Sequence, residues 1–576
     1  MTTQPAYLPP ALAQGRAWGF AVNLYALRSR RNWGIGDLTD LRDVVRFAAA
    51  AGADMVGVNP LHALHYVEPE AASPYSPTSR YFNNPLYLDI EAVAEFTSDH
   101  ERAAALRARV RSGEFATMLE TLRATTHVAY TRVARAKYSA LEECYAVFRE
   151  RRDERRSTFR TYVESGGTRL ERFATYEALT ERFVRGDGSE RGWRSWPAEY
   201  RDPGGEAVRS FALMEHRRIE YFKYIQWLTD LQLAAVAQEA ETLTIGLYLD
   251  VAVGVDRDSA DVWSDSGAYV LDETVGAPPD ALGPHGQNWF LAPLEPAGMI
   301  RDGGVAFAEL LAANMRYAGA LRLDHVMALV RLFRIPLGQR ATQGRYVAYP
   351  LDELLPLLRA ASDEAHCLIV GEDLGNVPAG FRERMEREGI FSYRVLLFER
   401  EPDGAFRLPE RYPHVALATA TTHDAPTLIG WAVGRDIDTH AAIGLTSSER
   451  TELAHNARRV EVSLLFDALR RSGELDGESF ARLHRRVDER QTQAGIFDDF
   501  VRAAYRFLAR SPARLVLIQL DDALGELDQV NLPGTDTEYP NWRRRSSVDI
   551  ERFVTDRRLE ALVSDVRRMV SERTSR

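Results

Sequence analysis

The sequence is poor in cysteine and has no long apolar run. Two cysteines, Cys144 and Cys367, occur among 576 residues, which excludes a disulfide framework or a cysteine-based zinc site. No stretch approaches 18 uninterrupted apolar residues, so we expect no membrane span. Residues 1–16 lack the basic segment followed by an apolar segment that marks a secretory signal. We therefore expect a cytoplasmic protein.

The sequence also lacks a surplus of basic residues. It has 72 Lys and Arg against 83 Asp and Glu, a formal net charge of -11. Without excess positive charge to neutralise phosphates, nucleic acid is not expected as a partner. No phosphate-cradling glycine motif, dinucleotide fingerprint or elbow-type serine is found in the required setting. We expect no metal and no cofactor.

Short apolar runs recur along the chain and are predicted to be β-strands. Helical patterns lie between several of them, an alternation that is typical of a parallel sheet. Eight such runs favour a closed α/β fold, the (β/α)₈ TIM barrel, over an open sheet. The predicted strands span residues 18–27, 54–61, 243–255, 321–327, 367–374, 392–398, 415–422 and 514–520.

The chain is much longer than the roughly 250 residues of a bare barrel, and two helical stretches explain the excess. The arginines of the first stretch are typical of a solvated helix face rather than a binding patch. We predict a barrel start at 1–97, a helical insertion at 98–240, a barrel core at 241–445, a second insertion at 446–508, and barrel closure with a C-terminal helix at 509–576.

Charged residues end four of the predicted strands. They are Asp250, Arg322-Leu323-Asp324-His325, Glu372-Asp373 and His423-Asp424. The carboxyl ends of all strands of such a barrel meet at one rim, where TIM-barrel enzymes have their active sites. Carboxylates gathered there by chance would repel one another at a cost in stability. The pattern therefore favours an active site at the rim.

Arg322 and Asp324 are two residues apart on one predicted strand, so their side chains share a face. A cation fixed beside a carboxylate keeps the acid ionised, as a nucleophile requires. The alternative is a structural ion pair within a large domain. The acids on the neighbouring strand ends favour the catalytic interpretation.

Two kinds of chemistry suit a rim of carboxylates. A Mg²⁺ site of three acids is one, but Arg322, His325 and His423 beside the acids would weaken metal binding. Glycosyl transfer is the other, with one carboxylate as nucleophile and a second, protonated carboxyl as acid. Aromatic residues of the loops could stack on sugar rings or pack beneath the loops; they are Tyr75, Trp263, Tyr269, Trp289 and Phe290.

At these residues the sequence resembles the 4-α-glucanotransferases called amylomaltases or disproportionating enzymes, glycoside hydrolase family 77. The resemblance covers nearly the whole chain, and it is specific because the motifs occur in the family's order. They are NWGIGDL (32–38), SPY (73–75), DSADVW (258–263), GAPPD (276–280), GQNW (286–289), RLDH (322–325), GEDLG (371–375), THD (422–424), VNLPGT (530–535) and YPNWR (539–543).

The resemblance implies a (β/α)₈ barrel with helical insertions and no C-terminal β-sandwich. It implies a retaining transfer of α-1,4-glucan segments from a maltooligosaccharide donor to the 4-hydroxyl of an acceptor glucan or glucose. Asp324 would be the nucleophile, Glu372 the general acid/base and Asp424 the transition-state stabiliser. The implied substrate-binding residues are Tyr75, Asp250, Gln287, Trp289, Arg322, His325 and His423.

Adjacent acids in the fifth predicted strand pose a choice. Strand alternation directs only one of Glu372 and Asp373 into the cleft, and the longer Glu372 reaches a leaving oxygen more easily. One departure from the family pattern is the acidic segment 520–524 (LDDAL), which we expect to alter a rim loop and not the chemistry.

The three acids do not decide the acceptor. Water would make the enzyme a hydrolase of the α-amylase kind, whereas a glucan hydroxyl would make it a transferase. We expect the loop at 255–294 to be a lid that excludes water. A glucan-binding barrel without activity and a metal-dependent lyase or isomerase are also compatible with a barrel of this kind.

A retaining reaction predicts that the carboxyl groups of Asp324 and Glu372 lie about 5–5.5 Å apart.

Overall fold

Residues 4–184, 192–279, 285–489 and 497–574 are described by the structure, a computed structural model of the chain. Asp280, the last residue of the GAPPD motif, lies outside these ranges. None of the helices within the described ranges is both long enough and apolar enough to cross a membrane.

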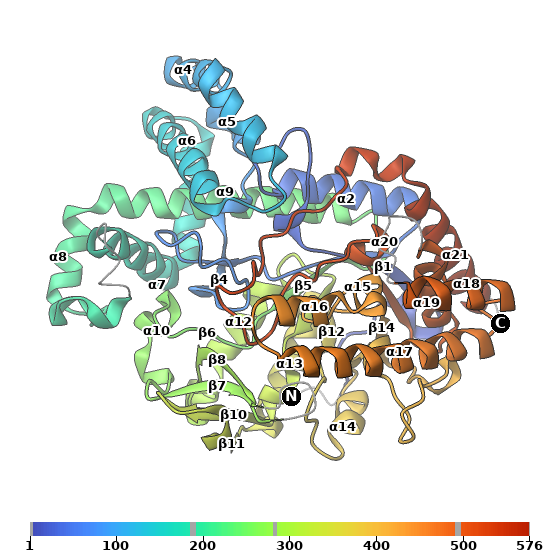
Figure 1. The fold of residues 1–576 in the computed structure, drawn as a ribbon. Coiled ribbons are helices and arrows are strands. Elements are labelled where there is room, and N and C mark those ends of the chain that lie inside the picture. The colour runs from blue at the N-terminus through green and yellow to red at the C-terminus, as the bar shows by residue number, and fades with distance from the viewer. Residues whose placement is uncertain (1–3, 185–191, 280–284, 490–496, 575–576) are drawn as a thin grey trace.

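Eight parallel strands close into a barrel, which confirms the predicted (β/α)₈ fold (Figure 1). Each predicted strand range contains most of one barrel strand. Around the barrel the order is β1 (Ala17–Val22), β15 (Leu515–Gln519), β14 (Ala416–Thr419), β13 (Phe391–Val395), β12 (Leu368–Gly371), β9 (Ala320–Leu323), β5 (Gly246–Val251) and β2 (Met55–Val58), which pairs with β1.

Several barrel strands end earlier than predicted. The apolar runs continue into 3-10 turns at η1 (Leu24–Ala26), η8 (Val326–Leu329) and η10 (Leu396–Phe398). The predicted strand at 321–327 was therefore wrong beyond Leu323, where His325 takes a left-handed φ of 45°. These turn residues are mostly buried, so their hydrophobicity continued the strand pattern although the backbone had already turned.

Helices pack on the outside of the barrel strands. Helix α2 (Leu38–Ala51) begins at Asp37, whose side chain accepts hydrogen bonds from two backbone N–H groups, and ends at the left-handed Gly52. Other helices that pack on barrel strands are α12 (Val305–Met315) on β5 and β9, α14 (Phe381–Arg387) on β13, α19 (Asp498–Arg510) on β14 and β15, and α21 (Arg557–Thr574) on β1.

Long helices lie in both predicted insertion segments. In the first segment α4, α5 and α6 project from one side of the molecule, at the top of Figure 1. Its helices are α4 (Glu101–Val110), α5 (Gly113–Ala124), α6 (Tyr130–Glu150), α7 (Glu154–Phe183), α8 (Glu206–Met214) and α9 (His216–Ala240). The second contains α17 (Ser448–Arg471) and α18 (Gly477–Asp488). The division of the chain into segments stays a prediction.

An antiparallel sheet occupies much of the region that we expected to be a loop lid. Its strand order is β11 (Arg345–Ala348), β10 (Arg331–Pro336), β7 (Glu273–Ala277), β8 (Gln287–Ala292) and β6 (Val255–Asp256). The 255–294 stretch is therefore not a continuous loop, and its role as a lid stays a prediction. Central strand β7 pairs with β10, which follows the barrel strand β9, and such distant pairing leaves little signal in local hydrophobic periodicity.

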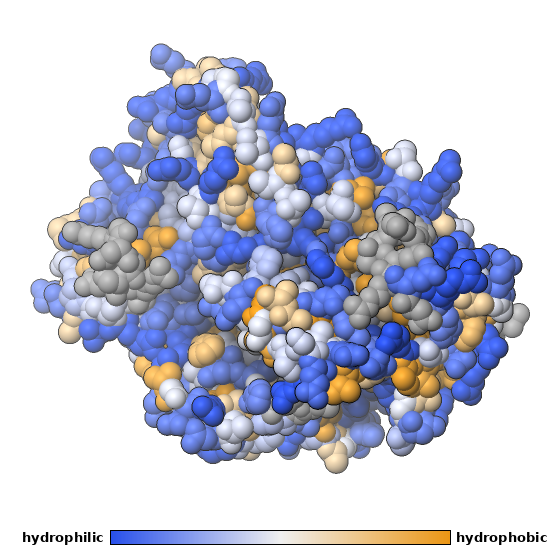
Figure 2. Space-filling view, viewed as in Figure 1, coloured by the Kyte–Doolittle hydropathy of each residue, from blue (hydrophilic) through white to orange (hydrophobic). Residues whose placement is uncertain are grey.

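The visible surface is largely polar. Figure 2 shows a mostly hydrophilic face with apolar side chains scattered over it in small groups. Scattered apolar side chains are normal on a protein surface and need no partner.

Candidate active site

Barrel register brings the predicted site residues together at the carboxyl ends of the strands. Asp250 of β5 is the register partner of Arg322 on β9, and Gly371 of β12 is the partner of Leu323. Asp324 and Glu372 follow directly after their strands. The charges that end three neighbouring strands therefore converge on a single site.

Arg322 is at the centre of this site. Its Nη1 atom lies 2.8 Å from Asp250 Oδ2 and 3.0 Å from Asp324 Oδ1, and its Nη2 atom lies 4.0 Å from Glu372 Oε2. The arginine side chain is 10% exposed. A nearly buried cation shared by three acids stabilises negative charge on them, most directly on the two carboxylates that it contacts.

Asp324 is held by backbone as well as by Arg322. Its Oδ2 atom accepts a hydrogen bond from the backbone N–H of Val253 at 3.3 Å, and its own N–H donates to the carbonyl of Val251 at 3.2 Å. Both partners belong to the end of β5 and the turn after it. The carboxylate is therefore fixed between β5 and β9, with one oxygen toward the arginine.

Glu372 has a raised affinity for its proton. Burial raises the pKa of Glu372 to about 7, and the charge of Asp324 adds to this effect while Arg322 opposes it. Its Oε2 atom accepts from the N–H of His325 at 2.9 Å, and Oε1 accepts from the N–H of Leu374 at 2.6 Å. At neutral pH this carboxyl is therefore poised between its two protonation states.

Asp373 points to a different set of partners. It accepts hydrogen bonds from Arg382 Nε and Ser392 Oγ, both at 2.7 Å, and from the N–H of Tyr393 at 2.9 Å. The two adjacent acids thus alternate as strand geometry predicts, and Glu372 is the one beside Arg322.

His423 and Asp424 form a second charged pair at the rim. His423 Nε2 lies 3.3 Å from Asp424 Oδ2, and Asn531 donates to Asp424 Oδ1 at 2.7 Å. The Asp424 side chain is 52% exposed, although the surrounding rim still desolvates it. Desolvation alone would raise the pKa of Asp424, but His423 and Asn531 outweigh it and lower this pKa to about 2. Asp424 is therefore anionic throughout the physiological range.

Tyr75 joins the two charged clusters. Its hydroxyl donates to Asp250 Oδ2 at 2.6 Å, and its ring stacks on His423 with centroids 4.6 Å apart. Burial and the charge of Asp250 raise the pKa of Tyr75 well above its ordinary value, so the phenol remains a donor. The predicted loop tyrosine therefore contacts the site through both its ring and its hydroxyl.

Gln287 and Trp289 reach the site from β8 of the antiparallel sheet. The Trp289 ring meets His325 edge to face, with centroids 5.3 Å apart, and its Nε1 donates to Gln287 Oε1 at 3.0 Å. Burial lowers the pKa of His325 to about 4 against the opposing charge of Asp324, so this imidazole is neutral at pH 7. The antiparallel sheet thus covers the residue next to Asp324.

Two site residues were missed by sequence reasoning. Asn531 contacts Asp424, and Trp542 packs against the rings of Tyr75 and His423 at centroid distances of 5.5 and 5.3 Å. Both belong to family motifs, VNLPGT and YPNWR, but the motifs alone gave no reason to join them to the barrel rim. Their arrival at the site depends on the return of the chain after β15.

Trp263 is not available to a sugar. It is fully buried, it packs against Tyr176 and Trp196, and its Nε1 donates to the carbonyl of Tyr200 at 3.0 Å. Packing beneath a loop, rather than stacking on a sugar, therefore describes this residue. Phe290, in contrast, is 65% exposed.

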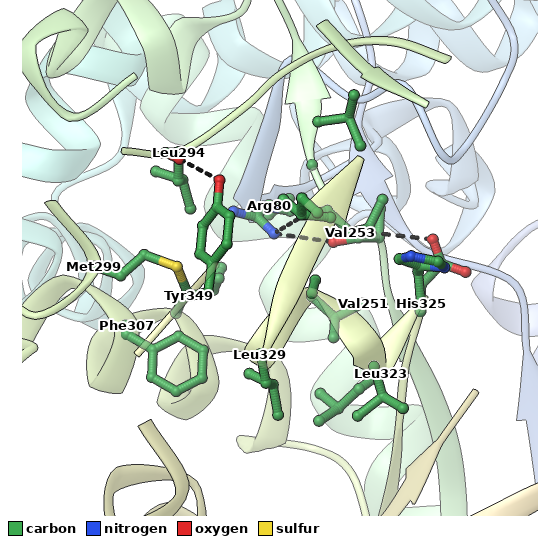
Figure 3. Close-up of a pocket in the computed structure, with 18 of the residues that line it drawn as sticks. Arg80, Val251, Val253, Leu294, Met299, Phe307, Leu323, His325, Leu329 and Tyr349 are labelled. Atoms are coloured by element: carbon green, nitrogen blue, oxygen red, sulfur yellow. Dashed lines mark hydrogen bonds between the residues drawn. The ribbon is translucent and has the colours of Figure 1, made fainter. Parts of the chain in front are cut away.

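An apolar cavity of about 80 Å³ lies on one side of Asp324 and His325 (Figure 3). Its wall is mainly aliphatic and aromatic, and includes Val251, Val253, Leu294, Met299, Phe307 and Tyr349. Such a wall offers few partners for the hydroxyl groups of a sugar. The polar side of the rim, with Tyr75, His423 and Asp424, is the face suited to a carbohydrate.

Fold and site together define a class of enzyme. A (β/α)₈ barrel that holds one carboxylate against an arginine, beside a second carboxyl with a pKa near 7, is typical of enzymes that break glycosidic bonds through two carboxyl groups.

Comparisons with known proteins give the family. The glycoside hydrolase 77 profile, described as 4-alpha-glucanotransferase, matches residues 22–549. The 4-alpha-glucanotransferase of Haemophilus influenzae is 36% identical over 554 residues, 95% of this chain and 77% of the relative. That of Mycobacterium tuberculosis is 35% identical over 585 residues, 97% of this chain and 76% of the relative.

Solved structures of amylomaltases are also similar to this chain. The amylomaltase of Corynebacterium glutamicum matches with a TM-score of 0.83 at 29% identity, covering 98% of this chain and 77% of that one. The Streptococcus agalactiae amylomaltase, solved with acarbose, shares the fold with a TM-score of 0.72 at 17% identity, covering 96% and 99%. The chain belongs to the 4-alpha-glucanotransferase family, glycoside hydrolase 77. It is a glucanotransferase, as the motifs predicted, and the alternative of a hydrolase is not better supported.

Proposed function

We propose that Asp324, Glu372 and Asp424 perform the glucan transfer by a retaining double displacement. Asp324 is the nucleophile, Glu372 the general acid/base, and Asp424 the transition-state stabiliser. The observation that carries this assignment is the difference between the first two acids. Arg322 contacts Asp324 at 3.0 Å, whereas burial raises the pKa of Glu372 to about 7.

In the first step the carboxylate of Asp324 attacks the anomeric carbon of the donor glucan. Glu372 transfers its proton to the departing glycosidic oxygen, so the leaving glucan departs as a neutral alcohol. The electron pair of the broken C–O bond leaves with that oxygen, and an ester between the glucosyl unit and Asp324 results. Arg322 and the Val253 N–H orient the attacking carboxylate.

Formation of the ester turns Glu372 from a general acid into a general base. The negative charge of Asp324 is one cause of the raised pKa of Glu372, and esterification removes that charge. The pKa of Glu372 therefore falls once the intermediate forms, and the carboxylate accepts a proton from the incoming hydroxyl. The oxygen of that hydroxyl bonds to the anomeric carbon while the ester bond breaks, and its electron pair leaves with Asp324 as a carboxylate. The same residue acts as acid and then as base because its neighbour changes charge.

Asp424 remains anionic through both steps because its pKa is about 2. A fixed negative charge stabilises the positive charge that develops on the sugar ring. About half of its side-chain surface is exposed, so its carboxylate can also accept hydrogen bonds from sugar hydroxyls. We assign the remaining sugar contacts to Tyr75, Asp250, Gln287, Trp289, Arg322, His325 and His423.

The acceptor we propose is a second α-1,4-glucan, a maltooligosaccharide or glucose, which attacks through its 4-hydroxyl. Trp289 and Gln287 on the antiparallel sheet cover His325 and so restrict the approach of water beside Asp324. We also propose a cytoplasmic location, in keeping with two cysteines that are both free and buried.

Incubation with maltotriose tests this function. Transfer predicts products both longer and shorter than the substrate, and Asp324→Asn should abolish both. Products that are all shorter would identify a hydrolase instead. Loss of activity after exhaustive chelation would point to metal-dependent chemistry, and binding without turnover would leave a glucan-binding barrel.

A further inference from the structure

Asp522 is a buried acid outside the proposed chemistry. It lies in α20 (Leu520–Ala523), the single helical turn that follows barrel strand β15, and it is 1% exposed. It belongs to the acidic segment 520–524 that departs from the family pattern. An isolated buried carboxylate is costly unless its oxygens are well hydrogen-bonded, so its partners reveal what it does.

Three neutral donors satisfy Asp522. Its Oδ2 atom accepts from Thr421 Oγ1 at 2.7 Å and from the Tyr505 hydroxyl at 2.9 Å, and its Oδ1 atom accepts from the backbone N–H of Leu428 at 2.7 Å. An ionised carboxylate is an acceptor only, which matches three donors.

Two of these donors are the two ends of one loop. Thr421 comes just after β14, and Leu428 is the first residue of α15 (Leu428–Val433). Between them lie His423 and Asp424. A single carboxylate therefore fastens the entry and the exit of the loop that carries the proposed transition-state stabiliser.

Asp424 has few direct contacts of its own, and the rest of its loop is held at two further points: the His423 carbonyl accepts from the Asn531 N–H at 3.1 Å, and Thr427 Oγ1 donates to the Glu526 carbonyl at 2.6 Å. The Asp424 side chain is 52% exposed and contacts His423 and the Asn531 amide, and the Asp424 backbone N–H donates to Thr422 Oγ1 at 3.2 Å. A half-exposed side chain is positioned mainly by its backbone, so the loop ends determine where the charge sits. A displacement of about 1 Å is enough to lower a rate severely.

We propose that Asp522 is a positioning residue, whose two oxygens hold the 421–428 loop so that Asp424 and His423 face the reacting sugar. This inference rests on the role proposed above for Asp424. Asp522 itself touches no substrate.

The chain offers a matched pair of variants. Thr421→Val and Tyr505→Phe each remove one hydroxyl from the same Asp522 oxygen, and both residues are almost completely buried. Only Thr421 belongs to the loop. The Tyr505 hydroxyl also accepts from the N–H of Gln519 at 2.9 Å, so its loss should cost at least as much stability. Asp522→Ala would leave three buried donors unpaired and risks the fold.

Steady-state kinetics of the pair on maltotriose tests the proposal. We expect Thr421→Val to lower kcat about tenfold with KM changed less than twofold. Thr421→Ser, which keeps the hydroxyl, should restore kcat, and Tyr505→Phe should stay within about twofold of the parent enzyme while losing as much thermal stability. Equal kcat values for Thr421→Val and Tyr505→Phe would overturn the positioning role.

Asp424→Asn distinguishes failure of this inference from failure of the proposed function. If Asp424→Asn stays active, the role proposed for Asp424 is wrong. If Asp424→Asn is inactive while Thr421→Val is fully active, only the inference about Asp522 is wrong.

Discussion

The backbone N–H of His325 donates a hydrogen bond to Oε2 of Glu372 at 2.9 Å. His325 follows Asp324 directly, so the turn after the proposed nucleophile holds the proposed acid. The left-handed φ of 45° at His325 gives the backbone this direction. The relative position of the two carboxyl groups to which we assign catalysis is therefore set by one turn of the chain.

The pH dependence of the first chemical step should report Glu372. The acid form donates the proton, and its pKa is about 7, so kcat/KM for maltotriose should fall tenfold per pH unit above that value. An activated donor whose leaving group needs no proton, such as a maltosyl fluoride, should show no such alkaline limb. A maltotriose profile flat to pH 9 would contradict the assignment.

Glu372 should also make stability depend on pH. Its folded pKa lies above its ordinary value of 4.5, so its contribution is fully present below about pH 4.5 and is lost as pH rises through about 7. Glu372→Gln removes this loss. We expect the variant to gain on the parent by on the order of 2–3 kcal/mol between pH 4.5 and pH 8 in urea unfolding. A pH-independent difference would show that the carboxyl is not perturbed.

Removal of the central cation should damage both fold and catalysis. Arg322→Leu leaves Asp250, Asp324 and Glu372 close together without a compensating charge, which should cost about 3–5 kcal/mol of unfolding free energy at pH 7. The cost should shrink as pH falls and the acids take up protons. Arg102→Leu is the control. Arg102 pairs with Glu143 and Glu150, and all three side chains are more than 40% exposed. The Arg102→Leu substitution should therefore change the unfolding free energy by less than about 1 kcal/mol.

Trp289 should govern the choice between sugar and water as acceptor. Trp289→Ala uncovers His325 next to Asp324, so we expect a several-fold larger share of hydrolysis in the maltotriose products. Tyr346→Ala removes an aromatic residue from β11 of the same sheet, where it packs on Phe333, and should leave that share unchanged. An unchanged share of hydrolysis in Trp289→Ala would show that the tryptophan does not exclude water from the site.

Phe290 carries backbone strain that glycine would relieve. Its φ is 58°, a region that bulky residues avoid, and its side chain is 65% exposed. We expect Phe290→Gly to raise the unfolding free energy by about 1 kcal/mol, since strain of about 1–3 kcal/mol outweighs the added freedom of the unfolded chain. Asp302→Gly, at a φ of 53°, should gain less because aspartate tolerates this region. A destabilised Phe290→Gly would show that the side chain makes contacts that matter.

Sequence reasoning recovered the barrel because each strand is a short apolar run, and charged residues follow several of them at the carboxyl end. The same pattern located Asp250, Arg322, Asp324 and Glu372, since parallel strands bring their ends to one rim. The antiparallel sheet was missed because β7 finds its partner β10 only after a barrel strand has intervened. Asn531 and Trp542 were missed for a similar reason, because long-range return of the chain leaves no local signal.

Trapping the covalent intermediate tests the role of Asp324 most directly. Glu372→Gln should still accept a glycosyl unit from a maltosyl fluoride, whose leaving group needs no acid, but it lacks the base that activates the acceptor. We expect a glycosyl ester on the peptide that contains Asp324, identified by mass spectrometry after acid quench and digestion, and none in Glu372→Gln/Asp324→Asn. An adduct on any other residue, or rapid turnover without one, would contradict the assignment of Asp324 as the nucleophile.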